Sequence, residues 1–161
     1  LMFWIIDGHN LIPHVPGISL RDLDDESKLI QWLLDFARIE QDTIAVYFDQ
    51  APVGQPSVKK FGRVTAHFVR IGKTADQAIG ERVKREGKSA RNATVVSSDQ
   101  QVQRNARSLR AAILSSPEFV QRMIAASQKQ SSTEKREPDI PSHEVEEWMN
   151  LFNHGKKDKP D

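Results

Sequence analysis

The chain contains no cysteine among its 161 residues. This absence excludes a disulfide framework, thiolate metal sites and a thiol nucleophile, so that any bound metal ion needs oxygen or imidazole ligands. The sequence also has no glycine-rich phosphate loop, no Gly-x-Ser-x-Gly elbow and no Cys-x-x-Cys pair. The common signatures of nucleotide-binding proteins, serine hydrolases and zinc proteins are therefore missing.

The chain also begins without a long hydrophobic run. Leu1 to Ile6 is apolar but far too short for a signal peptide or a membrane span. We therefore expect a cytoplasmic protein with no membrane partner. A chain of 161 residues, 38% of them hydrophobic, is long enough for one domain with a proper core, but not for a second globular unit.

Charge is unevenly distributed, although the net charge is only +1. From Ser19 to Asp42 seven acidic residues outnumber three basic ones, whereas from Lys73 to Arg110 nine basic residues outnumber four acidic ones. A basic region of this kind suits a polyanionic substrate. The alternative is a pair of solvated helix faces without a binding role.

Hydrophobic periodicity predicts alternating strands and helices. Strands are expected at Met2–Asp7, Thr43–Asp49, Arg63–Arg70, Ala93–Ser97 and Ala111–Leu114, and helices at Asp25–Glu40, Thr74–Arg85, Asp99–Arg107 and from Ser116. The strand at 63–70 alternates polar and apolar residues, which favours a sheet edge, and Gly8-His9-Asn10 is expected to be a turn. The pattern favours an α/β fold with a mostly parallel sheet covered on both sides.

The C-terminal part differs in composition from the rest. Residues 1–127 are predicted to form the folded domain, because residues 128–140 are rich in Gln, Ser, Lys and Glu and have little to bury. We expect a flexible linker at 128–140, then a helix at 141–155 with Trp148 and Phe152 on one face, and a basic tail at 156–161.

Four aspartates stand where predicted strands end or helices begin: Asp7, Asp49, Asp76 and Asp99. Carboxyl ends of parallel strands line one crevice, so acids at these points are expected to converge although they are far apart in sequence. Converging carboxylates repel one another unless a hard divalent cation such as Mg²⁺ or Mn²⁺ lies between them. The pattern predicts a metal-dependent phosphodiesterase.

Each aspartate taken alone has a structural explanation as a turn or helix-capping residue. Asn10 is expected to orient a water molecule or a phosphate oxygen, or else to form an Asx-turn, and His9 to pack, cap or act as an acid-base group. Ser97 and Ser98 are candidate hydroxyls for supporting the ligands, and Thr74 is a candidate N-cap.

These residues resemble a known family. Ile5-Ile6-Asp7-Gly8-His9-Asn10, the strand ending in Asp49, Thr74-Ala75-Asp76 and Val95-Val96-Ser97-Ser98-Asp99 are similar, in that order, to the YacP-like branch of NYN domains, relatives of PIN-domain nucleases. The resemblance covers about residues 2 to 124. It implies a Rossmann-like three-layer α/β/α sandwich and an endoribonuclease centre that uses Mg²⁺ or Mn²⁺. The implied catalytic and metal-binding residues are Asp7, Asp49, Asp76 and Asp99, with Asn10 assisting.

One departure concerns the second metal position. The family usually has a further acid directly after Thr-Ala-Asp and another three residues on, where this chain has Gln77 and Gly80. These positions therefore lack the acids that would hold a second ion, which is compatible with a slow enzyme or with a domain that binds RNA without cutting it.

The sequence leads to the hypothesis of a cytoplasmic RNase that acts on messenger RNA or ribosome-associated RNA through metal-activated water. Asp7, Asp49 and Asp99 are expected to hold the principal ion, with Asp76 completing the site or holding a second ion from the helix N-terminus. The residues expected to hold the RNA backbone are Lys73, Arg82, Lys84, Arg85 and Arg91. The alternatives are a catalytically weak RNA- or ribosome-binding module and a phosphatase acting on a small substrate.

Overall fold

The computed structural model describes the backbone of residues 1–136 and the side chains of residues 1–130. Leu1–Ser127 forms one compact unit. The helices and strands of residues 1–136 are β1 (Phe3–Asp7), α1 (Gly8–Leu11), η1 (Ile12–His14), α2 (Asp25–Glu40), β2 (Thr43–Ala51), β3 (Val58–Phe61), β4 (Val64–Arg70), α3 (Ala75–Glu86), η2 (Gly87–Asn92), β5 (Ala93–Val96), α4 (Gln100–Ser108), β6 (Ala112–Leu114) and α5 (Ser116–Arg136). None of the helices between residues 1 and 136 has the length and hydropathy that crossing a membrane requires.

The strands form one six-stranded sheet in the order β3-β4-β2-β1-β5-β6. All neighbouring pairs are parallel except β3 and β4, which are antiparallel. The chain builds the sheet outward from β1 in one direction and then returns to build β5 and β6 on the other side of β1. Such a reversal of direction opens a crevice at the carboxyl ends of the central strands.

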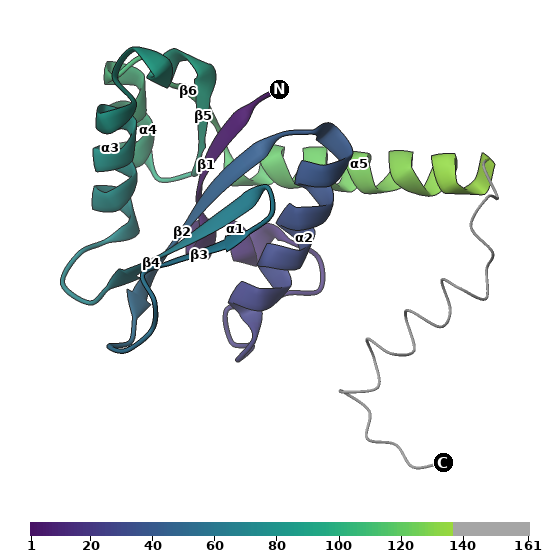
Figure 1. The fold of residues 1–161 in the computed structure, drawn as a ribbon, viewed down its shortest axis with the longest axis horizontal. Helices are drawn as coiled ribbons and strands as arrows, with labels where there is room; N and C mark the ends of the chain where they lie inside the picture. The colour runs from purple at the N-terminus through teal and green to yellow at the C-terminus, as the bar shows by residue number, and fades with distance from the viewer. Residues whose placement is uncertain (137–161) are drawn as a thin grey trace. The chain divides into compact units, whose positions relative to one another are not determined.

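Helices cover both faces of this sheet, because its central strands carry apolar side chains on both sides. Alternate residues of β1 point to opposite faces, with Trp4 and Ile6 in one core and Ile5 in the other. Residues of α2 and α5 complete the first core, and residues of α3 and α4 complete the second. Figure 1 shows these two helix pairs on opposite sides of the sheet. The predicted α/β sandwich with a mostly parallel sheet is confirmed.

Three local predictions are wrong. The strand at Val64–Arg70 is not at the edge, since β3 pairs with it on the outside through a tight turn at Gly62, whose φ is 60°. The segment Gly8–Leu11 forms a short helix instead of a turn. Helix α5 continues to Arg136, into the predicted linker. The predicted helix at 141–155 and the basic tail lie outside the described residues, and the domain boundary at residue 127 stays a prediction.

A buried carboxylate holds the start of the sheet together. Asp42 accepts hydrogen bonds from the backbone N–H of Met2 (2.9 Å) and from the indole Nε1 of Trp4 (3.0 Å). It is only 6% exposed, so both of its donors lose their partner if the carboxylate is removed.

Replacing Asp42 with Ala is therefore expected to lower the free energy of unfolding by about 1–3 kcal/mol, the cost of leaving a buried donor unpaired. Asp35→Ala is the matched control. Among the described residues Asp35 has an exposed pair with Arg38 within α2, and losing such a pair should cost less than about 1 kcal/mol. Urea unfolding of the two variants measures the difference. Equal midpoints would mean that the Asp42 contacts contribute no net stability.

Candidate active site at the carboxyl edge of the sheet

Two of the predicted acids come from adjacent central strands. Asp7 is the last residue of β1 and is buried. Asp49 lies near the end of β2, where the pairing with β4 shifts register between Phe48 and Ala51 and Gln50 has a φ of 60°. A bulge of this kind turns a side chain out of the regular alternation. The strand end thereby presents Asp49 at the edge of the sheet.

The other two acids stand at helix N-termini. Asp76 lies in the first turn of α3, and Asp99 is the N-cap of α4, where its Oδ1 accepts from the backbone N–H of Gln101 (2.8 Å) and Val102 (3.2 Å). The capping explanation therefore holds for one oxygen of Asp99. Asp49 reaches α3 as well, since its Oδ2 accepts from the backbone N–H of Ala75 (3.3 Å).

The four acids influence one another electrostatically. Burial, together with the charges of Asp76 and Asp49, raises the pKa of Asp7 to about 6, while the backbone N–H of Asn10 and the charge of His9 oppose the shift. Burial also raises the pKa of Asp76, with Asp99 and Asp49 contributing. Asp76 is thus coupled to all three of the other aspartates. The fold brings acids from four separate segments into one negatively charged region.

This region is not a ready-made coordination shell. Within residues 1–130, no three acidic or histidine side chains lie close enough together to hold a metal ion as they stand. Carboxylate oxygens are nonetheless the donors that Mg²⁺ and Mn²⁺ prefer. The donor chemistry therefore fits a hard divalent cation, and binding one requires these side chains to move toward one another.

His9 forms a bridge between Asp49 and a further acid, Glu26. His9 Nδ1 lies 2.8 Å from Asp49 Oδ1, and His9 Nε2 lies 2.8 Å from Glu26 Oε2 in the first turn of α2. The hydrogen bond with Glu26 is the largest cause that raises the pKa of His9 to about 9, and Asp49 adds to it. His9 is therefore an imidazolium that places one positive charge between two carboxylates.

Glu26 was not predicted from the sequence. It belongs to an acidic run at the start of α2, and its partner His9 is 17 residues away across an irregular loop. No spacing signal relates the two residues. Only the packing of α1 beside α2 brings them together.

Asn10 connects three segments around the site. Its Oδ1 accepts from the backbone N–H of Ser98 (2.9 Å) and from Ser116 Oγ (2.6 Å), while Ser98 Oγ accepts from the Ser116 N–H (3.1 Å). The buried Ser97 accepts the N–H of Asp99 with its Oγ (3.1 Å). In the structure these residues hold the loop that presents Asp99.

Thr74 and Gln77 form a capping box at the start of α3. Thr74 Oγ1 accepts from the Gln77 N–H (3.1 Å), and Gln77 Oε1 accepts from the Thr74 N–H (2.9 Å). Gln77, which departs from the family pattern, therefore stabilises the helix that carries Asp76.

The predicted RNA-binding residues do not all face the same way. Lys73, Arg82 and Arg85 line hollows beside α3. Lys84 and Arg91 are exposed and line neither hollow.

Comparison with known proteins places the chain among related sequences and structures. The family model described as "YacP-like NYN domain" matches residues 4–154. The crystal structure of Rae1 (YacP) from Bacillus subtilis is similar, with a TM-score of 0.77 and 19% identity over 97% of this chain and 95% of that one. A point mutant of the same protein gives a TM-score of 0.70 and 21% identity, over 90% of each chain. The search of curated proteins found no match.

Proposed function

Because this chain belongs to the YacP-like NYN domain family, we propose that it is a metal-dependent endoribonuclease that hydrolyses phosphodiester bonds in RNA. NYN domains are domains of nucleases and RNA-related proteins, which gives the general kind of activity. The substrate, the metal and the residue roles are our proposal.

The observation that carries the proposal is the shared electrostatics of the four aspartates. Asp7 is buried with its pKa raised to about 6, and the charges of Asp76 and Asp49 contribute to that shift. Unneutralised carboxylates in one region destabilise the protein, and a divalent cation bound between them offsets the repulsion. A site that keeps such a charge surplus at the crevice of an α/β sheet is suited to a Mg²⁺ or Mn²⁺ ion.

We assign the ion to Asp7, Asp49, Asp76 and Asp99. A bound ion of this type lowers the pKa of a coordinated water molecule and neutralises charge on the phosphate. His9 has a different role, since the positive charge of its imidazolium balances the negative charges of Asp49 and Glu26. Asn10 keeps the Asp99 loop in position through its bonds to Ser98 and Ser116 and so assists without contacting the substrate.

Lys73, Arg82 and Arg85 are the cations that we assign to the RNA backbone. We leave Lys84 and Arg91 out of this assignment, because they line neither hollow beside α3. The ribosome is the partner we propose for presenting the substrate, and the cytoplasm the place of action. The second candidate function is an RNA- or ribosome-binding module with weak or no catalysis. Two observations favour it. Among the described residues the acidic side chains do not form a preformed coordination shell, and Gln77 and Gly80 stand where the family pattern has acids.

Cleavage of a 5′-labelled single-stranded RNA separates the two functions. We expect internal cleavage with Mn²⁺ or Mg²⁺, none with EDTA, and a loss of more than about 100-fold in Asp76→Asn, because a metal ligand should matter more than the outer partners whose loss costs 10–100-fold. Asp35→Asn, purified identically, controls for contaminating nucleases and should cleave like the wild type. RNA binding without metal-dependent cleavage would favour the binding module.

A further inference from the structure

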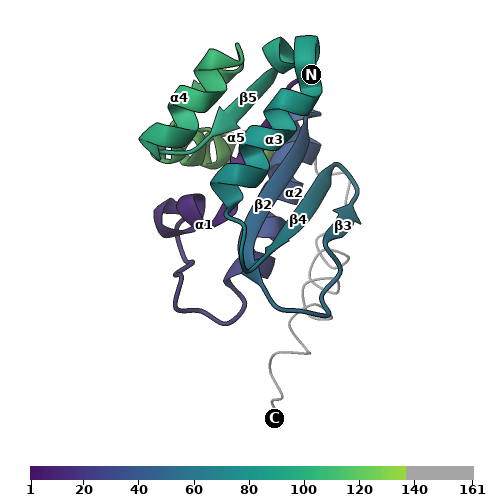
Figure 2. The same cartoon turned by 90° about the vertical axis from the view of Figure 1, so that its left-hand side faces the viewer.

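Helix α3 leaves part of its face of the sheet uncovered. Figure 2 views the molecule from the α3 side, with α3 lying over β2 while β4 and β3 extend beyond it. A hollow of about 380 Å³ between α3 and β4 is lined by residues including Tyr47, His67, Arg70, Lys73 and Arg85. A second hollow, of about 230 Å³, is lined by residues including Phe3, Lys60, Arg63, His67 and Arg82. His67 lines both hollows, so they adjoin one another, and we call the two together the α3 groove.

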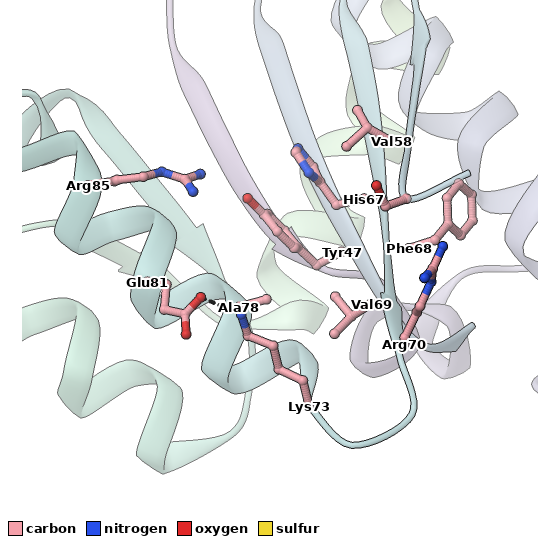
Figure 3. A pocket seen from close by; sticks show the side chains of 11 residues that line it. Tyr47, Val58, His67, Phe68, Val69, Arg70, Lys73, Ala78, Glu81 and Arg85 are labelled. Atoms are coloured by element: carbon pink, nitrogen blue, oxygen red, sulfur yellow. Dashed lines mark hydrogen bonds and ion pairs between the residues drawn. The ribbon is translucent and has the colours of Figure 1, made fainter. Parts of the chain in front are cut away.

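The α3 groove is strongly basic. Its cationic residues are Lys60, Arg63, Arg70, Lys73, Arg82 and Arg85. Glu81 is the acid among the lining residues, and it is paired with Lys73. Figure 3 shows Arg85 reaching from α3 toward Tyr47 and His67 on the sheet. A groove with this charge attracts a polyanion.

Arg82 is held in place before any ligand arrives. Its Nε donates to Glu86 (2.8 Å), one terminal nitrogen donates to the Tyr47 hydroxyl (3.2 Å), and its guanidinium lies 5.1 Å from the centre of the Phe3 ring. These contacts fix a side chain that would otherwise lose conformational freedom on binding. A fixed guanidinium therefore binds a phosphate at a lower entropic cost.

His67 lies in the floor of the α3 groove with an unused polar atom. Its ring stacks on Tyr47, with centroids 4.3 Å apart and planes 8° from parallel. Its Nε2 is buried and has no hydrogen-bond partner in the described protein. Burial lowers the pKa of His67 to about 4, with help from Arg82 and Arg85, so the ring is neutral near pH 7. An unpaired buried nitrogen destabilises the protein, and a ligand that bonds to it after the ring turns toward the groove recovers part of that cost.

We propose that the α3 groove binds one strand of the RNA substrate, with phosphates on its cations and one base hydrogen-bonded to His67 Nε2 once the imidazole has turned toward the groove. This inference rests on the proposed ribonuclease function. A volume of about 380 Å³ lies within the range of small-ligand pockets, which suits a nucleotide of a single strand and not a duplex. Lys73 directly precedes Thr74, which caps the helix that carries Asp76. One end of the groove therefore adjoins the aspartates, and the strand leaves them along α3.

The first test compares two neighbouring cations on α3. Arg85 lines the groove, whereas Lys84 lies about 100° further round the helix and is exposed. Binding of a fluorescein-labelled single-stranded RNA is measured by anisotropy in EDTA at several salt concentrations. Arg85→Ala should weaken binding about three- to tenfold and reduce the salt slope by about 0.7, the value for one phosphate contact with a single strand. Lys84→Ala should change neither, and equal effects of the two variants would overturn the proposal.

The second test concerns the base contact. His67→Phe keeps an aromatic ring against Tyr47 but removes the unpaired nitrogen, so its melting temperature should hold or rise while RNA affinity falls about threefold or more at an unchanged salt slope. His67→Gln, which can form a hydrogen bond, should restore part of the affinity. An RNA affinity of His67→Phe equal to that of the wild type would contradict the proposed base contact.

A third comparison separates this inference from the proposed function. An unlabelled duplex of the same length should compete poorly with the single strand, and equal competition would also overturn the groove proposal. Cleavage by the wild type in Mn²⁺ is measured independently. If the wild type cleaves RNA but Arg85→Ala and Lys84→Ala change RNA binding equally, the groove proposal is contradicted and the ribonuclease proposal is not. If binding depends on Arg85 but the wild type does not cleave RNA, the ribonuclease proposal is contradicted and the groove proposal is not.

Discussion

Replacing Asp7 with Asn is expected to stabilise the metal-free protein and to abolish RNA cleavage. The variant keeps the size of the side chain and an oxygen that can accept from the Asn10 N–H, but it removes a buried charge. Cleavage should fall more than 100-fold, because Asp7 is the most buried of the proposed metal ligands. Unfolding in EDTA and cleavage in Mn²⁺ measure the two effects.

The size of the stability change depends on pH. The pKa of Asp7 is 3.8 in the reference state and about 6 in the folded protein. Below pH 3.8 the carboxyl is neutral in both states and costs nothing, whereas between 3.8 and 6 the unfolded state ionises first and wild-type stability falls. Above pH 6 the penalty is complete, at about 2–3 kcal/mol. In Asp7→Asn this loss of stability should not occur. In EDTA the variant should therefore be as stable as the wild type at pH 3.5, and its excess of unfolding free energy over the wild type should be largest above pH 6.

The exposed variant Asp35→Asn serves as the control and should change the free energy of unfolding by less than about 1 kcal/mol. An Asp7→Asn protein that is less stable than the wild type at pH 7 in EDTA would show that Asp7 is a structural residue. A stable Asp7→Asn protein that still cleaves RNA would remove Asp7 from the proposed metal site.

Replacing Gly8 with Ala is expected to cost about 3 kcal/mol of unfolding free energy and to disable the site. A Cβ added at Gly8 would lie 2.6 Å from Cδ1 of Phe48 and closer still to Cε1. Phe48 is fully buried and stacks against Phe68, so its ring cannot move aside cheaply. Because Gly8 lies between Asp7 and His9, the strain displaces both residues.

Gly80→Ala is the matched control, since Gly80 lies within α3 and an added Cβ meets nothing within 4 Å. Alanine is the better helix former, so this variant should gain roughly 0.5–1 kcal/mol. In thermal and urea unfolding, the midpoint of Gly8→Ala should therefore lie below that of the wild type and the midpoint of Gly80→Ala above it. A Gly8→Ala protein that is as stable as Gly80→Ala would mean that α1 can shift away from Phe48 without cost.

Local signals in the sequence predicted most of the fold, because the central strands are continuous apolar runs and several helices begin at recognisable caps. Thr74 and Asp99 cap the predicted helices through their side chains. Strand β3 escaped prediction, since Val58-Lys59-Lys60-Phe61 is short and mostly exposed and is held by its pairing with β4. Neither its composition nor its periodicity distinguishes it from a loop.

The candidate site was predicted only where residues mark the ends of strands or helices. The four aspartates have that property. The bridge from His9 to Glu26 does not, because it depends on how α1 packs beside α2. His67 showed no metal-like spacing, and its unpaired nitrogen results from the register of β4 between β2 and β3. Such features arise from tertiary contacts, which no local pattern records.

The contact between Asn10 and Ser116 has a consequence for the order in which the protein is made. Its two partners are 106 residues apart in sequence, and Ser116 also holds Ser98 beside Asp99. During synthesis the aspartate-bearing strands and helices emerge first, while the residue that fastens their loops together comes close to the end of the Leu1–Ser127 unit. A nascent chain therefore acquires the complete site only when nearly all of that unit has left the ribosome.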